Sequence, residues 1–198
     1  TAYSIDMTDH GSAAASSLMN ALRATYDASI AVGYSPLVST SIYCGEYSKQ
    51  QILWVMAGNY AVSQGEYTGA ELRQMMEWLV NVKDNGANPI RHRNYMPVTS
   101  GMEYKVTEYE QGKFRLEELT INGAPLDDTA TYTVFVAGID VWIENEVYCN
   151  CPMPENLKAK RTEYAIEGAE SRSCLKDSLA VSKQFPAPSE YLTIVQGE

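Results

Sequence analysis

The chain has 198 residues, of which 45% are hydrophobic and 20% are charged. This composition is typical of a globular protein and argues against extensive disorder. The balance of 15 basic and 25 acidic residues gives a net charge of -10, which repels phosphate backbones and anionic lipid surfaces. We therefore expect no nucleic-acid partner, and the length favours a single domain over residues 1–198.

The sequence contains no run approaching the roughly 20 consecutive apolar residues that a membrane span requires. Residues 1–20 also lack the basic start and apolar core of a secretion signal. Because the chain begins at Thr1 without methionine, we expect a processed product or a segment of a longer chain.

Local patterns in the first third of the chain predict a helix, a strand and a second helix. Residues 12–27 carry apolar side chains at helical spacing, and the following SIAVGY segment reads as a short buried strand. Residues 34–46 contain proline, glycine and many hydroxyl side chains, which favours a loop. Ser48 and Gln51 have the spacing of a capping box, so a short helix is expected to begin there.

The segment from Tyr67 to Val82 is predicted to be a packed helix. Thr68 and Glu71 form a second capping box, and NYAVSQ at 59–64 is expected to be a strand leading into it. The helix should end near Asp84, where turn residues begin. Its apolar residues have the spacing of one buried helical face: Leu72, Met75, Met76, Leu79 and Val80.

Beyond residue 100 the apolar period changes to two, which indicates strands. Gln111-Gly112 and Asn122-Gly123 are hairpin-turn signals, so an antiparallel meander is expected. The apolar positions of this pattern are Met102, Tyr104, Val106, Phe114, Leu116, Tyr132, Val134 and Val136.

The last third of the chain is predicted to be less regular. Residues 149–172 are rich in charge and proline and are expected to form a long surface excursion. A helix is expected over 173–183 and a closing strand over 191–195. Because helices and strands neither alternate strictly nor segregate, the order favours an α+β fold with a mixed, partly antiparallel sheet and packed helices.

The order of several motifs resembles the C-terminal domain of bacterial and animal 5′-nucleotidases. The resemblance covers most of residues 12–145, and the SEYLTIVQG tail is similar to the closing strand of that family. The motifs that carry it are SSLMNALR at 16–23, DASIAV at 27–32, CGEYS at 44–48, YTGAELRQMME at 67–77, VTSGMEYKV at 98–106 and LTINGAPLDDTATYTVFVAGID at 119–140.

The resemblance implies a periplasmic, cell-surface or extracellular protein whose C-terminal domain binds the base and ribose of a nucleotide. It also implies a separate N-terminal metallophosphoesterase domain with two divalent metal ions that perform the hydrolysis. This chain lacks the aspartate and histidine constellation of such a site, and Asp9-His10 is an isolated pair. We therefore assign no catalytic residue and no metal ligand to this segment, and no cofactor of its own.

The resemblance places substrate-binding residues on three loops, each altered in this chain. In the first loop, Tyr34 stands where the family has asparagine and Ser39 where it has arginine, the side chain that clamps anions. In the second loop, Gly58 and Asn59 remain but the Pro-Phe pair is missing, so Tyr60 is the candidate replacement ring, with core packing as the alternative role.

The third loop reads VWIENEVY after the VFVAG strand. Trp142 preserves an aromatic side chain and Asn145 is a remnant of the family motif, whereas its glycines and ribose-binding aspartate are absent. Glu144 or Glu146 offers an alternative hydroxyl acceptor. Three simultaneous changes predict a nucleotide pocket that has been lost or rebuilt.

Four cysteines, Cys44, Cys149, Cys151 and Cys174, favour disulfides over zinc, because the CNC pair does not have CxxC spacing. With the first and third loops convergent in the family fold, we expect Cys44 to pair with Cys149 or Cys151, and Cys174 with the remaining one.

The sequence has one local basic cluster, Arg91-His92-Arg93. We interpret it as a solvated surface group or, alternatively, as an anion-binding site.

Two functional hypotheses follow. The first is a substrate-binding C-terminal domain of a secreted 5′-nucleotidase-like phosphohydrolase, inactive alone, with a nucleotide or related small molecule as ligand. The second is a non-enzymatic extracellular binding or interaction module on the same scaffold. A stand-alone enzyme of another class is disfavoured, because the sequence has no nucleophile elbow or phosphate loop.

Overall fold

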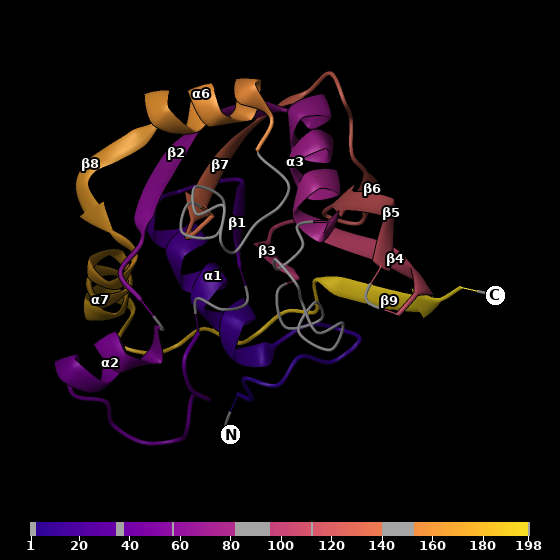
Figure 1. Ribbon diagram of the computed structural model, residues 1–198. Coiled ribbons are helices and arrows are strands. Elements are labelled where there is room, and N and C mark those ends of the chain that lie inside the picture. The colour runs from indigo at the N-terminus through magenta and orange to yellow at the C-terminus, as the bar shows by residue number, and fades with distance from the viewer. Residues whose placement is uncertain are drawn as a thin grey trace.

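The computed structural model describes residues 3–34, 38–56, 58–81, 96–111, 113–139 and 153–197. In these residues, two mixed sheets are combined with five helices (Figure 1), which confirms the predicted α+β class. The helices are α1 (Ala13–Thr25), α2 (Lys49–Val55), α3 (Gly69–Asn81), α6 (Glu155–Glu163) and α7 (Ser171–Ser182). The strands are β1 (Ile30–Tyr34), β2 (Ala61–Thr68), β3 (Pro97–Ser100), β4 (Glu103–Glu110), β5 (Lys113–Ile121), β6 (Ala124–Pro125), β7 (Thr131–Ala137), β8 (Ala165–Glu170) and β9 (Leu192–Gln196).

The larger sheet has the strand order β3-β1-β7-β2-β8. Its central strands β1 and β7 run parallel to each other, while the other neighbours are antiparallel. Ile30, Val32, Val134 and Val136 are buried in these two strands. Their nearly continuous apolar sequences suit a sheet interior that is covered on both faces.

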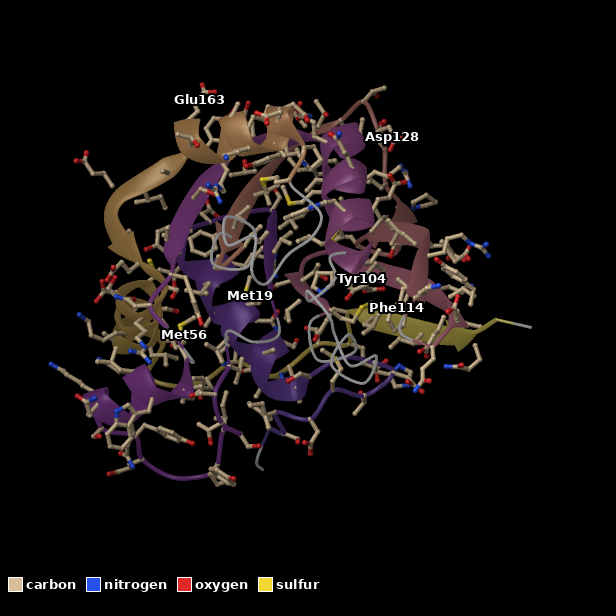
Figure 2. All side chains as sticks on the ribbon, in the orientation of Figure 1. Met19, Met56, Tyr104, Phe114, Asp128 and Glu163 are labelled. Carbon is tan, nitrogen blue, oxygen red and sulfur yellow. The ribbon has the colours of Figure 1, made fainter. Side chains whose placement is uncertain are left out.

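The smaller sheet has the order β6-β5-β4-β9. The β4–β5 and β5–β6 pairs are antiparallel, as predicted, and Asn122 and Gly123 have the positive φ angles of 52° and 76° that a hairpin turn requires. Gly112 lies outside the described residues. Tyr104 and Phe114 are buried side chains of this sheet (Figure 2).

The predicted meander is wrong at β7, which leaves the small sheet and inserts between β1 and β2 in the large one. The alternation of Tyr132, Val134 and Val136 identified a strand correctly, but apolar period carries no information about which strand lies beside it. The fully buried end of β7, from Val134 to Ala137, suits a central strand.

Helix α3 lies between the two sheets and contacts β2, β3 and β5 (Figure 1). Its predicted apolar stripe is at most 5% exposed at every position. The predicted capping box is present: the Glu71 backbone N–H donates to Thr68 Oγ1 at 3.2 Å, and the Thr68 N–H donates to Glu71 Oε2 at 2.8 Å. The predicted end near Asp84 lies outside the described residues.

Other local predictions are also confirmed. Helix α1 begins after Ser12, α2 has a complete capping box between Ser48 and Gln51, and β9 occupies the expected closing position. Helix α7 begins at Ser171 and ends at Ser182, and it is followed by the C-cap residue Lys183, which has a left-handed φ of 62°. The strand expected at 59–64 is longer, because β2 continues to Thr68.

The expectation of an irregular excursion over 149–172 is wrong for residues 155–170, which form α6 and β8. Helix α6 buries a single side chain, Leu157, so its sequence has no apolar stripe to detect. The helix is positioned instead by Lys160, whose Nζ lies 2.6 Å from Glu71 Oε2 and 3.2 Å from the Glu66 carbonyl oxygen.

Replacement of Thr68 by alanine should destabilise the fold by about 1 kcal/mol, because it removes the hydroxyl that caps α3. Urea unfolding followed by circular dichroism measures the difference. Thr193→Ala, at an exposed position of β9, is the matched control and should have a smaller effect. Equal losses in both variants would contradict a capping role.

Glu71 should make the stability of the chain pH-dependent. Burial by itself raises the pKa of Glu71, but hydrogen bonds from Lys160 and Thr68 outweigh it and hold the pKa below its ordinary value. The ionised carboxylate therefore stabilises the fold above the unfolded pKa of about 4.3. That contribution is lost as the pH falls through the lower folded-state value.

Glu71→Gln keeps an acceptor oxygen for Thr68 and removes the charge facing Lys160. The variant should be less stable than the wild type at neutral pH, and the difference should shrink as the pH falls below the unfolded pKa of about 4.3. Urea unfolding across this pH range measures it. A Lys160→Met variant completes a double-mutant cycle, and additive effects of the two changes would show that the ion pair contributes no coupling.

Candidate functional site

The bases of the three altered loops lie at one edge of the large sheet. Parallel pairing puts the carboxyl ends of β1 and β7 at the same edge, and antiparallel pairing brings the start of β2 there. Gly33 and Val62 are both register partners of Ala137. We call this the loop edge. Its position follows from strand direction alone.

Of the predicted binding residues, Ser39, Asn59 and Tyr60 are placed at or next to the loop edge. Tyr34 ends β1 at this edge, and its side chain lies outside the described part of the structure. Trp142 and Asn145 also fall outside the described residues, as do Glu144, Glu146 and the Arg91-His92-Arg93 cluster. The assignment of all six site residues to ligand binding stays a prediction.

Ser39 is attached to the end of α2. Its backbone N–H donates to the Val55 carbonyl oxygen at 2.8 Å, and its hydroxyl donates to the carbonyl oxygens of Trp54 and Val55. The neighbouring residues Val38 and Met56 form an isolated antiparallel bridge. The first loop is therefore joined directly to the segment that leads into the second loop.

The second loop is bound to the start of α7. The Asn59 amide donates to the Glu170 carboxylate and accepts a hydrogen bond from the Arg172 backbone N–H at 3.3 Å. The Tyr60 N–H donates to Ser171 Oγ at 3.0 Å, and the Ser171 N–H donates back to the Tyr60 carbonyl oxygen at 2.8 Å. Both polar ends of the Asn59 side chain are thus engaged within the fold.

The Tyr60 ring lies over its own turn. A Cβ atom on Gly58 would come within 2.4 Å of Tyr60 Cζ, so glycine permits this close approach. The ring is half-buried, and burial raises the pKa of Tyr60 while the Arg172 charge acts in the opposite direction. The ring packs against the core as the alternative interpretation expects.

Arg172 is a component of this region that sequence reasoning missed. Its Nη2 donates to the Met56 carbonyl oxygen at 2.9 Å, and Met56 lies where α2 meets α7 (Figure 2). Its Nε is buried and has no hydrogen-bond partner among the described residues. No sequence signal identified it, because Arg172 lies at the end of the segment that was expected to be irregular.

A metal centre needs several ligating side chains close together. No group of three or more His, Cys, Asp or Glu residues that could hold a metal ion occurs in the described ranges. His10 Nδ1 lies 3.9 Å from Glu190 Oε2, and both side chains are largely exposed. The arrangement at the loop edge provides hydrogen bonds, one guanidinium and one aromatic ring, which are groups for binding.

The two described cysteines, Cys44 and Cys174, are not joined to each other. Cys44 is exposed, whereas Cys174 is buried on α7 and its Sγ lies 2.8 Å from the Tyr26 hydroxyl. Burial raises the pKa of the Cys174 thiol, which makes a reactive thiolate unfavourable there. Cys149 and Cys151 lie outside the described residues, so the disulfide pairing stays a prediction.

Comparisons with known proteins found related folds. The chain superposes on a 5′-nucleotidase precursor from Thermus thermophilus with a TM-score of 0.68 and 16% identity, covering 100% of this chain and 39% of that one. It superposes on the Haemophilus influenzae NAD nucleotidase with a TM-score of 0.63 and 13% identity, covering 96% and 34%.

A third solved structure, the Thermus thermophilus sulfate thiohydrolase SoxB, matches with a TM-score of 0.60 and 16% identity, covering 91% of this chain and 31% of that one. At these identities the likeness establishes a shared fold. The chain spans well under half the length of each of these proteins. No curated protein matches the sequence significantly.

The described residues contain no helix with the length and apolar character needed to cross a membrane. The family model for the 5′-nucleotidase C-terminal domain matches residues 5–139, which is more than half of the chain. The match includes the strands and helices that build the loop edge, from β1 to β7. The chain therefore belongs to the 5′-nucleotidase C-terminal domain family.

Proposed function

We propose that this chain is the substrate-binding C-terminal domain of a secreted 5′-nucleotidase-like phosphohydrolase, with an altered nucleotide pocket and no catalysis of its own. Family membership supports the first part of the proposal. The extracellular, cell-surface or periplasmic location rests on the same membership. The solved relatives include a 5′-nucleotidase, an NAD nucleotidase and a sulfate thiohydrolase, so the scaffold by itself does not specify a substrate.

The altered pocket rests on how the loop-edge residues use their hydrogen-bonding groups. Ser39 stands where the family has arginine, and its hydroxyl binds the carboxyl end of α2. Asn59 binds Glu170 and Arg172 with its side chain. Polar groups engaged in this way would have to break internal hydrogen bonds before they could bind a ligand, at a cost comparable to the bonds gained.

Catalysis in the proposed protein belongs to an N-terminal metallophosphoesterase domain outside this chain. Divalent metal ions there would activate water and stabilise charge on the phosphoryl oxygens. The present domain would supply binding energy for the base and ribose, which holds the phosphate in the geometry needed for attack.

A non-enzymatic extracellular binding module is the second candidate. The observation that favours it is that the three binding loops are altered together while the scaffold motifs remain. An upstream metallophosphoesterase domain with its metal-binding motifs in the full-length gene would support the first proposal. A full-length chain without such motifs would support the module.

Nucleoside and nucleotide binding tests the altered pocket. We expect adenosine and uridine to bind weakly to the chain, and AMP and UMP to bind no more tightly than the nucleosides, because the first loop has no arginine for the phosphate. Isothermal titration calorimetry measures the affinities. Clearly tighter binding of the nucleotides than of the nucleosides would contradict the proposed loss of the anion clamp. No measurable binding of any of the four compounds would count against a retained nucleotide site.

Restoration of the family residue sharpens this test. Ser39 is exposed, so the Ser39→Arg variant should fold, and it should bind AMP about tenfold more tightly than the wild type if the loop still faces a phosphate. Thr193→Arg adds the same charge on β9 of the other sheet and should leave AMP affinity unchanged. Equal effects of both variants would indicate nonspecific charge attraction.

The isolated chain should release no phosphate from AMP or UMP above the buffer rate, with or without added Mn²⁺ or Zn²⁺, because the proposed catalytic site lies in another domain. A colorimetric phosphate assay provides the measurement, with a complete 5′-nucleotidase as positive control. Metal-dependent phosphate release by the isolated chain would overturn the assignment of catalysis to a separate domain.

A further inference from the structure

A concave site lies away from the loop-edge side chains. It has a volume of about 720 Å³, which falls in the range of small-molecule binding pockets, roughly 300–1,000 Å³. Ser39, Asn59 and Tyr60 do not line it. We call it the aromatic pocket, and the side chains that define it are Tyr3, Ile42, Tyr43, Tyr47, Leu179 and Phe185.

The walls of the aromatic pocket come from three separate segments. Tyr3 and Ile42 are joined by a reciprocal pair of backbone hydrogen bonds of 2.7 and 2.9 Å. The rings of Tyr47 and Phe185 pack edge to face, with centroids 5.5 Å apart and an interplanar angle of 71°. These contacts connect the N-terminal segment, the CGEYS loop and the chain that follows α7, so the walls of the pocket hold one another in place.

Several groups in the pocket have hydrogen-bonding capacity left for a ligand. The Tyr47 hydroxyl accepts a hydrogen bond from the Tyr43 backbone N–H at 2.6 Å, and its own proton has no acceptor among the described residues. Glu46, Lys183 and Gln184 also line the pocket and have exposed side chains. The pocket therefore combines apolar ring faces with both donors and acceptors.

Tyr43 provides the most accessible of these rings. Tyr43 is 62% exposed. Burial of an aromatic ring is favourable, so a ligand that covered this ring would gain binding free energy from the contact. Its backbone N–H is fixed by Tyr47, so the ring is carried on a positioned segment of the CGEYS loop.

We propose that the aromatic pocket binds the ring of an uncharged carbohydrate. The C–H faces of a sugar ring pack on aromatic side chains. Its hydroxyls both donate and accept hydrogen bonds, so they can pair with the donor and acceptor groups of Tyr47, Glu46 and Gln184. Tyr47 and Phe185 are steeply inclined to each other, so these two rings do not form a parallel slot that would sandwich a flat nucleobase. The net charge of -10 opposes anionic ligands. This proposal is independent of the proposed nucleotide function.

Saturation-transfer difference NMR tests the proposal on the full chain. The probes are glucose, galactose, mannose and N-acetylglucosamine, each with its linear oligomers, at about 10 mM, because single-ring ligands in open pockets bind at millimolar affinity. We expect at least one probe to bind and to shift the amide resonances of residues 42–47 and 183–185. Tighter binding of the oligomers than of the monosaccharide would identify a polymer chain, rather than a free sugar, as the source of the ligand ring.

Matched tyrosine variants locate the binding. Tyr43→Ala should weaken the affinity for the binding probe about fivefold, since it removes one stacking ring. Tyr109→Ala removes another exposed ring, 54% accessible and located on β4 of the small sheet, and should leave the affinity unchanged. Both variants change exposed positions, and unfolding midpoints close to the wild type verify that they fold.

Three results would overturn the proposal. They are no binding by any saccharide probe, equal affinity of the wild type and Tyr43→Ala, or amide shifts confined to residues outside the aromatic pocket. Adenosine serves as the comparison ligand: its binding at residues 42–47 without saccharide binding would also overturn the carbohydrate assignment. If adenosine does not bind at the loop edge, that result counts against the proposed nucleotide function and leaves the carbohydrate test unaffected.

Discussion

The apolar stripe of α3 is the constraint on which the rest of the fold depends. This face is buried between β2 and β3 of the large sheet and β5 of the small one, so the helix holds the two sheets together. The Thr68 and Glu71 cap starts the helix directly where β2 ends. Glu71 also receives Lys160 from α6. One carboxylate thus joins the helix start to an element far along the chain, because the two partners are 89 positions apart in the sequence.

Strand direction keeps the loop edge in place while the loop sequences vary. The bases of all three loops are set by backbone pairing of β1, β7 and β2, which makes no demand on loop side chains. In the described part of the first two loops, the side chains of Ser39 and Asn59 form hydrogen bonds within the protein. Ser39 binds the end of α2, and Asn59 binds the start of α7. The family scaffold has therefore been retained, and a different use of its binding loops is what we propose.

Much of the fold was predictable, because many elements carry their own local signals. The capping boxes at Ser48 and Thr68 and the apolar stripe of α3 depend on residues three or four apart. Helix α6 could not be found this way, since Leu157 is its single buried side chain. Motif positions singled out Ser39, Asn59 and Tyr60, whose role in ligand binding stays a prediction. Arg172 contacts Met56 across 116 positions, and no local pattern in the sequence indicates this contact.

The sequence by itself determined the family, the class of fold and the elements whose periodicity or caps are local. Only the tertiary structure decided that β7 enters the large sheet, and that α6 lies on β2 and binds Glu71 of α3 through Lys160. It also decided that the hydrogen-bonding groups of Ser39 and Asn59 bind within the fold. The tertiary structure also brings together the side chains of the aromatic pocket, which include Tyr3 and Phe185 from opposite ends of the chain. The physical reason is that periodicity records which face of an element is buried, while strand neighbours and hydrogen-bond partners are chosen between segments far apart in the chain.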